Sequence, residues 1–160
     1  MTLALRERIR TLHDGTCGYC GVSETGAGAS LTIDHFRPRA QGGTDEEENL
    51  VLCCHACNEF KGDFWPVAGQ LMLIHPRSED IRQFVRERED GTLVALQPRG
   101  EAHIACLRLN RLPSVARRLE LQRQARLLTA LETALARIQE AEERARRVEN
   151  ALESWRSLSR

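Results

Sequence analysis

Two short apolar runs flank a turn-rich interval within residues 31–62, which read LTIDHFRPRAQGGTDEEENLVLCCHACNEFKG. The first run predicts a strand over Leu31–His35 that ends in Asp-His, and Asn49–Leu52 predicts the returning strand. The glycine pair Gly42-Gly43 indicates a loop between them. The residues from Cys54 to Phe60 predict a helix that ends at the following lysine-glycine pair. The local order is therefore strand, loop, strand, helix.

The composition around this segment is that of a globular protein. The chain has 160 residues, a length that suits one domain of ordinary size. Its longest apolar runs are only a few residues, whereas a membrane span needs about 20. The apolar run Leu3–Leu5 is followed at once by charged residues, so no signal-peptide core is expected. We therefore expect a cytoplasmic protein with no membrane partner.

The net charge is zero, with 23 basic and 23 acidic residues, but the charges are unevenly distributed. Lys61 is the single lysine and the other 22 bases are arginines, whose planar guanidinium groups suit bidentate phosphate contacts. Residues 107–126 hold six arginines against the single acid Glu120. Zero net charge therefore does not exclude a nucleic-acid partner.

The cysteines form a second pattern, because four of the six lie in two C-x-x-C pairs, Cys17/Cys20 and Cys54/Cys57. In a reducing compartment this pattern favours one tetrahedral four-cysteine zinc site. The alternatives are disulfides or redox chemistry and simple buried thiols. The 33 residues between the pairs indicate a folded unit inserted into the site. Cys53 and Cys106 are left over and fit small buried hydrophobic positions.

The rest of the chain is predicted from periodicity alone. Residues 2–13 indicate a short helix, and residues 79–88 and 102–109 two more, with a strand at 92–96 after the Asp90-Gly91 turn. From Ser114 to about Leu158 there is no glycine or proline, which indicates one long helix or two with an unmarked joint. We expect three parts: a core over 1–65, a mixed helix and strand extension over 66–112, and a C-terminal helical part over 113–160.

One apolar stripe runs along the C-terminal helical part, and we call its nine residues the apolar seam. They follow one another at spacings of three and four, with one irregular step after Ile138: Leu128, Leu131, Leu135, Ile138, Ala141, Ala145, Val148, Leu152 and Trp155. Such spacing is typical of a coiled coil. The seam predicts a homodimer, and the alternative is that it packs on the core of its own chain.

The segment from residue 14 to 63 resembles the HNH endonuclease family. The family pattern runs from a C-x-x-C pair through a strand ending in Asp-His, a proline and Gly-Gly loop, and Asn-Leu-Val to a second C-x-x-C pair followed by Asn and Lys-Gly. This sequence matches it at Cys17–Cys20, Asp34-His35, Pro38, Gly42-Gly43, Asn49–Val51, Cys54–Cys57, Asn58 and Lys61-Gly62. The family's third signature residue is often His, and Asn58 represents a variant also found in the family.

The resemblance implies metal-dependent hydrolysis of DNA. His35 is the expected general base, because the ordinary pKa of histidine, about 6.5, suits proton removal from water near neutral pH. Asp34 and the side-chain oxygen of Asn58 are the expected ligands of a catalytic Mg²⁺ or Mn²⁺, which neutralises charge on the phosphate. By resemblance, Asn49 fixes the loop and helps to orient His35. Since neighbours in a regular strand face opposite sides, we expect a twist or bulge at Asp34-His35.

Three basic residues near this segment, Arg37, Arg39 and Lys61, are candidate phosphate contacts, or else solvated surface charges. The zinc is expected to be structural, because four thiolates leave no open coordination position. The sequence thus predicts an α+β, helix-rich protein with a ββα-metal nuclease core and a long C-terminal helical region. The alternatives are a non-catalytic zinc-bound nucleic-acid-binding module and a nuclease effector subunit of a larger defence or mobile-element complex.

Overall fold

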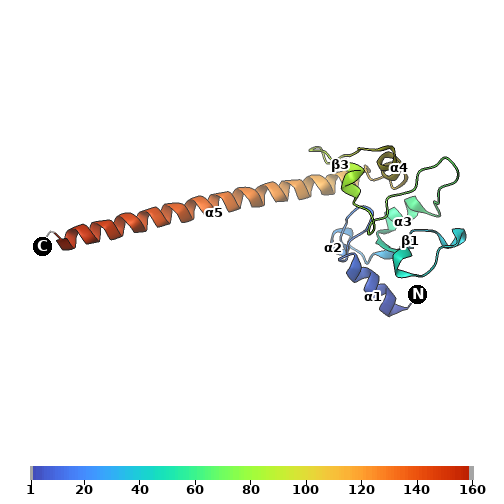
Figure 1. Ribbon diagram of the computed structural model, residues 1–160, viewed down its shortest axis with the longest axis horizontal. Coiled ribbons are helices and arrows are strands. Elements are labelled where there is room, and N and C mark those ends of the chain that lie inside the picture. Colours follow the sequence, from blue (N-terminus) through green and yellow to red (C-terminus); the bar gives the residue numbers. More distant parts are fainter. Residues whose placement is uncertain (1, 159–160) are drawn as a thin grey trace. The chain divides into compact units, whose positions relative to one another are not determined.

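The computed structural model describes residues 2–158 and confirms the α+β, helix-rich fold class. It forms two compact units, Met1–Arg118 and Leu119–Arg160. The helices and strands are α1 (Leu3–Leu12), α2 (Glu24–Ala27), β1 (Thr32–His35), β2 (Leu50–Cys53), α3 (His55–Lys61), β3 (Val85–Glu87), β4 (Leu93–Ala95), α4 (Pro98–Cys106) and α5 (Leu112–Leu158) (Figure 1).

The predicted strand, loop, strand, helix order is present at the centre of the first unit. β1 and β2 are antiparallel, with Thr32 opposite Cys53 and His35 opposite Leu50. All four residues of β2 are buried, because α1 packs against this strand through Ile9 and the cysteine turn lies beside it. α3 follows β2 directly and packs on β1. This arrangement places the carboxyl end of β1 beside the last turn of α3.

The ladder between β1 and β2 is regular through Asp34 and His35, so the expected bulge is absent. Both residues nevertheless contribute to one pocket, described below. They can do so because they are the last two residues of the strand, where the pocket lies at the strand's end rather than over one face.

The prediction of a helix over residues 79–88 is wrong. That segment holds a single 3₁₀ turn at Ile81–Gln83, with Asp80 as its cap, and then β3. β3 pairs with β4, with Val85 opposite Ala95, so the predicted strand at 92–96 is confirmed. The tight turn at Asp90-Gly91, where Gly91 has a φ of 75°, favours a hairpin, and this pairing overrides the local helical pattern.

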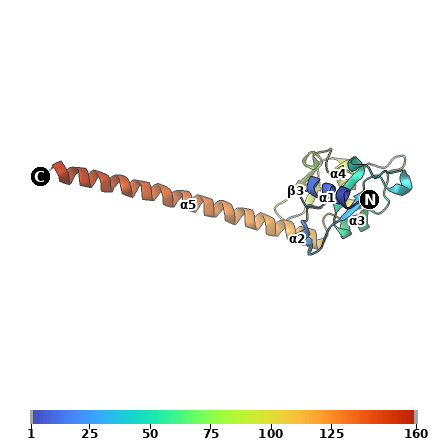
Figure 2. The same ribbon diagram turned by 90° about the horizontal axis from the view of Figure 1, so that it is seen from below.

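The two helices predicted after this hairpin are both present, and the first of them has different bounds. The helix expected at 102–109 begins four residues earlier, at Pro98, and ends at Cys106, because proline suits the first helical turn. The C-terminal region is one helix, and α5 runs without a break from Leu112 to Leu158 (Figure 1 and Figure 2). No helix among residues 2–158 is both long and apolar enough to cross a membrane.

A prediction follows from the packing of α4 against the β3–β4 hairpin. A Cβ atom on the buried Gly100 would lie 2.1 Å from the carbonyl oxygen of Phe84, so Gly100→Ala must displace backbone. We expect it to lower the free energy of unfolding by about 2 kcal/mol, measured by urea denaturation. Glu101→Ala, at the exposed neighbouring position, is the control. An unchanged unfolding midpoint for Gly100→Ala would contradict the close packing.

Candidate active site and metal centre

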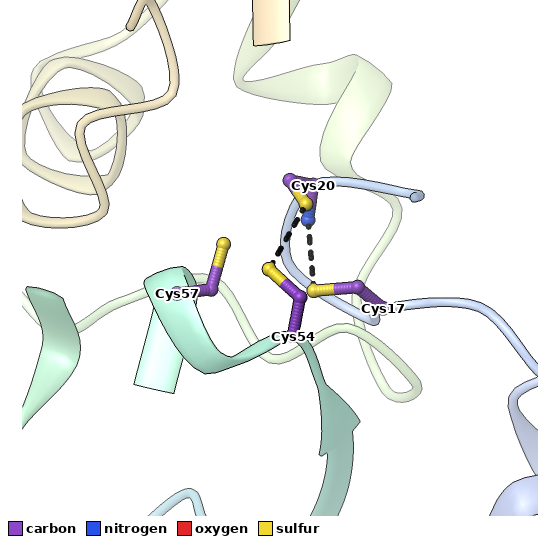
Figure 3. Close-up of side chains that lie close together, drawn as sticks. All are labelled: Cys17, Cys20, Cys54 and Cys57. Atoms are coloured by element: carbon purple, nitrogen blue, oxygen red, sulfur yellow. Dashed lines mark hydrogen bonds between the residues drawn. The ribbon is translucent and has the colours of Figure 1, made fainter. Parts of the chain in front are cut away.

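Four cysteines converge from two segments of the first unit. Cys17 and Cys20 come from the turn after α1, Cys54 is the N-cap of α3, and Cys57 lies in the first turn of that helix. Their Sγ atoms all lie within 4.8 Å of one another, and those of Cys20 and Cys54 are 3.7 Å apart (Figure 3). Four sulfurs around a tetrahedral zinc, each at about 2.3 Å, would lie roughly 3.8 Å apart. The cluster therefore fits a zinc site.

Hydrogen bonds among the four thiols lower the pKa of two of them and raise that of the other two. The Cys17 thiol lowers the pKa of Cys20 to about 6 and also lowers the pKa of Cys54, whereas hydrogen bonds with neighbouring cysteines raise the pKa of Cys17 and Cys57. The guanidinium group of Arg111 lies 3.6 Å from Cys57 Sγ and 3.9 Å from Cys54 Sγ. Since zinc with four thiolates carries a net negative charge, Arg111 supplies the compensating positive charge. This contact was not predicted from the sequence.

The two left-over cysteines lie outside the cluster. Cys53 is fully buried, and burial raises the pKa of its thiol. Its sulfur donates to Asn58 Oδ1 over 3.8 Å. Cys106 is half-buried, and burial raises the pKa of its thiol as well. Both are thiols of the core, as the sequence pattern indicated.

Asp34 is held in a buried polar network. The hydroxyl of Tyr19 donates to Asp34 Oδ2 over 2.6 Å, and Lys61 Nζ lies 3.0 Å from the same oxygen. The side chains of Lys61 and Asp34 are only 1% and 8% exposed. Lys61 also donates to the carbonyl oxygen of His35 over 2.9 Å. The carboxylate thus accepts hydrogen bonds from one ammonium group and one phenol.

His35 contacts a residue that sequence reasoning missed. Its Nε2 atom lies 2.7 Å from Asp45 Oδ1 and 3.1 Å from Arg39 Nε. Arg39 also donates to Asp45 Oδ2 over 2.7 Å. The hydrogen bonds from His35 and then from Arg39 lower the pKa of Asp45 to about 2. In the sequence, Asp45 is merely the first residue of an acidic run, and the nine residues between it and His35 carry no periodic signal.

Asn49 connects the two ends of the loop between the strands. Its Oδ1 accepts from the backbone N–H of Arg37 over 2.8 Å, and its Nδ2 donates to the carbonyls of Arg37 and Thr44 over 3.1 and 2.9 Å. A Cβ atom on Gly43 would lie 1.8 Å from the Arg37 carbonyl oxygen. The loop therefore depends on glycine at position 43 and on a side-chain amide at position 49.

A pocket of about 220 Å³ lies at the carboxyl end of β1. It is lined by three of the four expected catalytic residues, Asp34, His35 and Asn58, and also by Ile33, Pro38, Arg39, Ala40, Gly62 and Asp63. Asn49 is not part of this lining and acts on the loop instead. Asp63 was not singled out from the sequence. The pocket brings together an imidazole, a carboxylate and an amide oxygen from two elements.

The three candidate phosphate contacts lie in different surroundings. The side chain of Arg39 is 61% exposed at the pocket. Arg37 donates to the Gln41 carbonyl over 2.6 Å and stacks on the Trp65 ring at 5.4 Å, so its guanidinium group is engaged within the loop. Lys61 is buried against Asp34 and is not a solvated surface charge.

Comparisons with known proteins agree with this geometry. Residues 17–64 match the family model of the HNH endonuclease. A 48-residue segment is 48% identical to the CRISPR-associated endonuclease Cas9 of Corynebacterium diphtheriae. That match covers 29% of this chain and 4% of the relative, so the chain corresponds to a small part of the relative's length. No solved structure matches the chain.

The matched segment begins at Cys17, the first cysteine of the cluster, and ends three residues after Lys61, which pairs with Asp34. It therefore contains the whole cysteine cluster, the β1–β2 hairpin and α3, which are the elements that build the pocket. Because sequence similarity and geometry coincide over this segment, residues 17–64 of the chain are an HNH endonuclease domain.

Proposed function

We propose that the protein is a metal-dependent endonuclease that hydrolyses phosphodiester bonds in DNA. The observation that carries this proposal is that Asp34, His35 and Asn58 line the same pocket. Hydrolysis needs a base for the attacking water and a positive group for the charge that develops on the phosphate. The three side chains, with Arg39 beside them, supply the parts of such a site.

His35 is the proposed general base, and its contacts indicate which nitrogen acts. Nε2 cannot at once donate to Asp45 and accept from Arg39, because a neutral imidazole nitrogen is either a donor or an acceptor. The contact with the Asp45 carboxylate is the shorter one, 2.7 Å against 3.1 Å, and a charged acceptor strengthens it. We therefore assign the proton to Nε2, which leaves the lone pair of Nδ1 to accept the proton of water.

Asp34 and Asn58 are the proposed ligands of the catalytic cation, Mg²⁺ or Mn²⁺. Their donors are a carboxylate and an amide oxygen, the hard ligands that these ions prefer. The ammonium group of Lys61 contacts both oxygens of Asp34, so this ion pair has to loosen when the cation binds the carboxylate. When bound, the cation would act as a Lewis acid on the phosphate. Asn49 is the proposed support of the loop that carries Arg39 and Asp45.

Among the candidate phosphate contacts, we favour Arg39. Its guanidinium group is paired with Asp45 but lies exposed at the pocket, whereas Arg37 donates to the Gln41 carbonyl within the loop and Lys61 is buried against Asp34. Arg37 and Lys61 can reach a phosphate only if they give up those contacts. Arginine also suits a phosphate because its planar group forms paired hydrogen bonds.

The proposed metal of the four-cysteine cluster is zinc in a structural role. Four sulfur ligands complete a tetrahedral shell and leave no position for water or substrate. The catalytic cation is therefore a separate ion with oxygen ligands. The two sites are connected through the protein, because Tyr19, between Cys17 and Cys20, donates to Asp34.

Two alternatives keep the zinc cluster but change the role of the chain. A non-catalytic nucleic-acid-binding module would need the cysteines but not Asp34, His35 and Asn58 in one pocket, so the pocket favours the enzyme. A nuclease effector of a larger defence or mobile-element complex is the second candidate, and the similarity to a CRISPR-associated endonuclease favours it. Co-purification of partners with the intact chain distinguishes this candidate from an independent nuclease.

We also propose that the chain forms a homodimer through the apolar seam of α5. The large seam residues are at least half exposed within one chain, including Leu128, Leu131, Leu135 and Leu152. An apolar stripe of this length on a charged helix favours burial against a partner helix. A dimer would bring two nuclease domains to one DNA duplex.

The general base is tested by His35→Ala. We expect plasmid cleavage in Mg²⁺ or Mn²⁺ to fall by roughly 10² to 10⁴, while circular dichroism, zinc content and DNA binding stay unchanged. His55→Ala is the matched control, because His55 is exposed at the start of α3 and takes no part in the pocket. Cleavage at the wild-type rate in His35→Ala would refute the mechanism.

The catalytic cation is tested by titrating Mn²⁺ into the cleavage assay. Asn58→Ala should raise the Mn²⁺ concentration required by roughly tenfold or more, with Glu59→Ala as the exposed neighbouring control. Asp34→Asn is preferable to Asp34→Ala, because it keeps an oxygen acceptor for the buried Lys61 ammonium group, which Asp34→Ala would leave with backbone carbonyls alone. If EDTA too dilute to extract zinc leaves cleavage unchanged, the separate catalytic ion is disproved.

Zinc is tested by metal analysis of protein purified without chelators. We expect one zinc per chain, and Cys57→Ser should abolish binding and unfold the nuclease domain, because zinc binding contributes directly to folding. Cys53→Ala and Cys106→Ala, outside the cluster, should retain one zinc. Loss of zinc in Cys53→Ala with retention in Cys57→Ser would overturn the ligand assignment.

Self-association is tested by light scattering on the full chain and on a version truncated after Arg126. The full chain should have the mass of a dimer and the truncated chain that of a monomer, because the truncation removes the whole apolar seam. A monomeric full chain, or a truncated chain that still dimerises, would remove α5 from the interface.

A further inference from the structure

The C-terminal part of the apolar seam follows a strict heptad pattern. From Ile138 the seam residues follow at steps of three, four, three, four and three: Ala141, Ala145, Val148, Leu152 and Trp155. In a coiled coil, Ile138, Ala145 and Leu152 occupy a positions, and the other three occupy d positions. The side chains of Ile138, Val148 and Leu152 are 55%, 59% and 50% exposed within one chain. This face is therefore available to a partner helix.

The residues beside the heptad face carry charges of opposite sign on its two edges. The g positions that precede Ile138 and Ala145 are Arg137 and Arg144, and the e positions that follow Ala141 and Val148 are Glu142 and Glu149. In a parallel, in-register pair of helices, each g residue faces the e residue five positions later on the partner. Arg137 would face Glu142 and Arg144 would face Glu149, once from each chain.

We infer that α5 binds the α5 helix of a second copy in parallel and in register. This inference rests on the proposed self-association and adds its orientation. In the parallel pair both g–e contacts that join charged residues are attractive, and each occurs twice by symmetry. The third contact of this segment joins Ala151 and Arg156 and is neutral.

The antiparallel arrangement is less favourable for the same residues. There the g positions of one helix face the g positions of the other, so Arg137 and Arg144 would meet guanidinium groups or Ala151 and no acid. Within one helix Arg144 lies 3.8 Å from Glu140, and both side chains are more than two thirds exposed. An exposed pair of that kind is weak, so it does not prevent Arg144 from pairing across the interface.

The orientation has a consequence for the enzyme. In a parallel pair the two chains enter the coiled coil from the same end, so the coiled coil tethers the two nuclease domains at one end instead of holding them apart by its full length. Two tethered domains raise the effective concentration of the second active site once the first has bound DNA. The dimer thereby favours paired cuts over single nicks.

Cysteine cross-linking tests the orientation in the zinc-loaded, full-length protein. In a Cys106→Ser background, Ala141→Cys and Val148→Cys are introduced separately, since both are small changes at d positions. A parallel, in-register dimer brings each new cysteine opposite its own copy, within disulfide reach. Both variants should form disulfide-linked dimers under a glutathione redox buffer, identified on non-reducing gels and by mass spectrometry of the linked peptides. Glu143→Cys, on the outer face of the helix, is the control and should remain uncross-linked.

The outcomes separate orientation from self-association. An antiparallel dimer can place only one residue at its midpoint, so at most one of the two variants would cross-link to itself. Light scattering that shows a dimer together with one or no self-cross-link would overturn the parallel arrangement alone. A monomeric full-length chain would overturn self-association and the orientation together, and would leave the nuclease assays unaffected.

Charge reversal provides a second measurement. Replacing both Glu142 and Glu149 by arginine should raise the dimer dissociation constant by about tenfold or more, because both charged g–e pairs become repulsive. Replacing Glu143 and Glu153, which lie away from the heptad face, by arginine is the charge-matched control. Equal dissociation constants for the two double variants would show that the e positions do not face the partner's arginines.

Discussion

The convergence of four cysteine sulfurs is the constraint on which the nuclease fold depends. A two-stranded sheet is at best marginally stable by itself, and β1 and β2 are only four residues each. The cluster joins the turn after α1 to the start of α3, with all four Sγ atoms within 4.8 Å. Because Cys54 follows β2 directly, the same contacts fix the end of the sheet. A metal bound there would replace the large apolar core that so short a hairpin lacks.

The cysteine cluster also determines where the pocket carboxylate, Asp34, lies. Tyr19 belongs to the first cysteine pair and Lys61 ends the helix that begins with the second, and both contact Asp34. A buried ion pair stabilises a fold only weakly, because desolvation offsets the Coulomb attraction. The main effect of the ion pair here is to position Asp34, because the side chains that contact it come from both segments that carry the cysteine pairs. The hydroxyl and the ammonium group thus hold the carboxylate at the pocket.

The sequence was most informative where the signals are local. The C-x-x-C spacing predicted the cysteine cluster, and alternation with turn residues predicted the β1–β2 hairpin and α3. The helix expected at 79–88 was wrong, because its pattern competed with a hairpin pairing formed with residues 93–95. The contact of His35 with Asp45 and the burial of Lys61 depend on how the loop and α3 close over β1. A charged residue shows no local sign that tertiary packing will bury or orient it.

Residues outside the segment that matches the family model complete its packing and contact its cysteine cluster. The Arg111 guanidinium group lies beside two of the cluster sulfurs, and Arg117 donates to the Cys20 carbonyl over 2.5 Å. Leu107 and Leu109 are fully buried in the same core as β2. Since four thiolates concentrate negative charge in a partly buried site, a nearby cation lowers the cost of forming it. The residues after the matched segment therefore belong to the physical unit that contains the cysteine cluster, even though the family pattern ends before them.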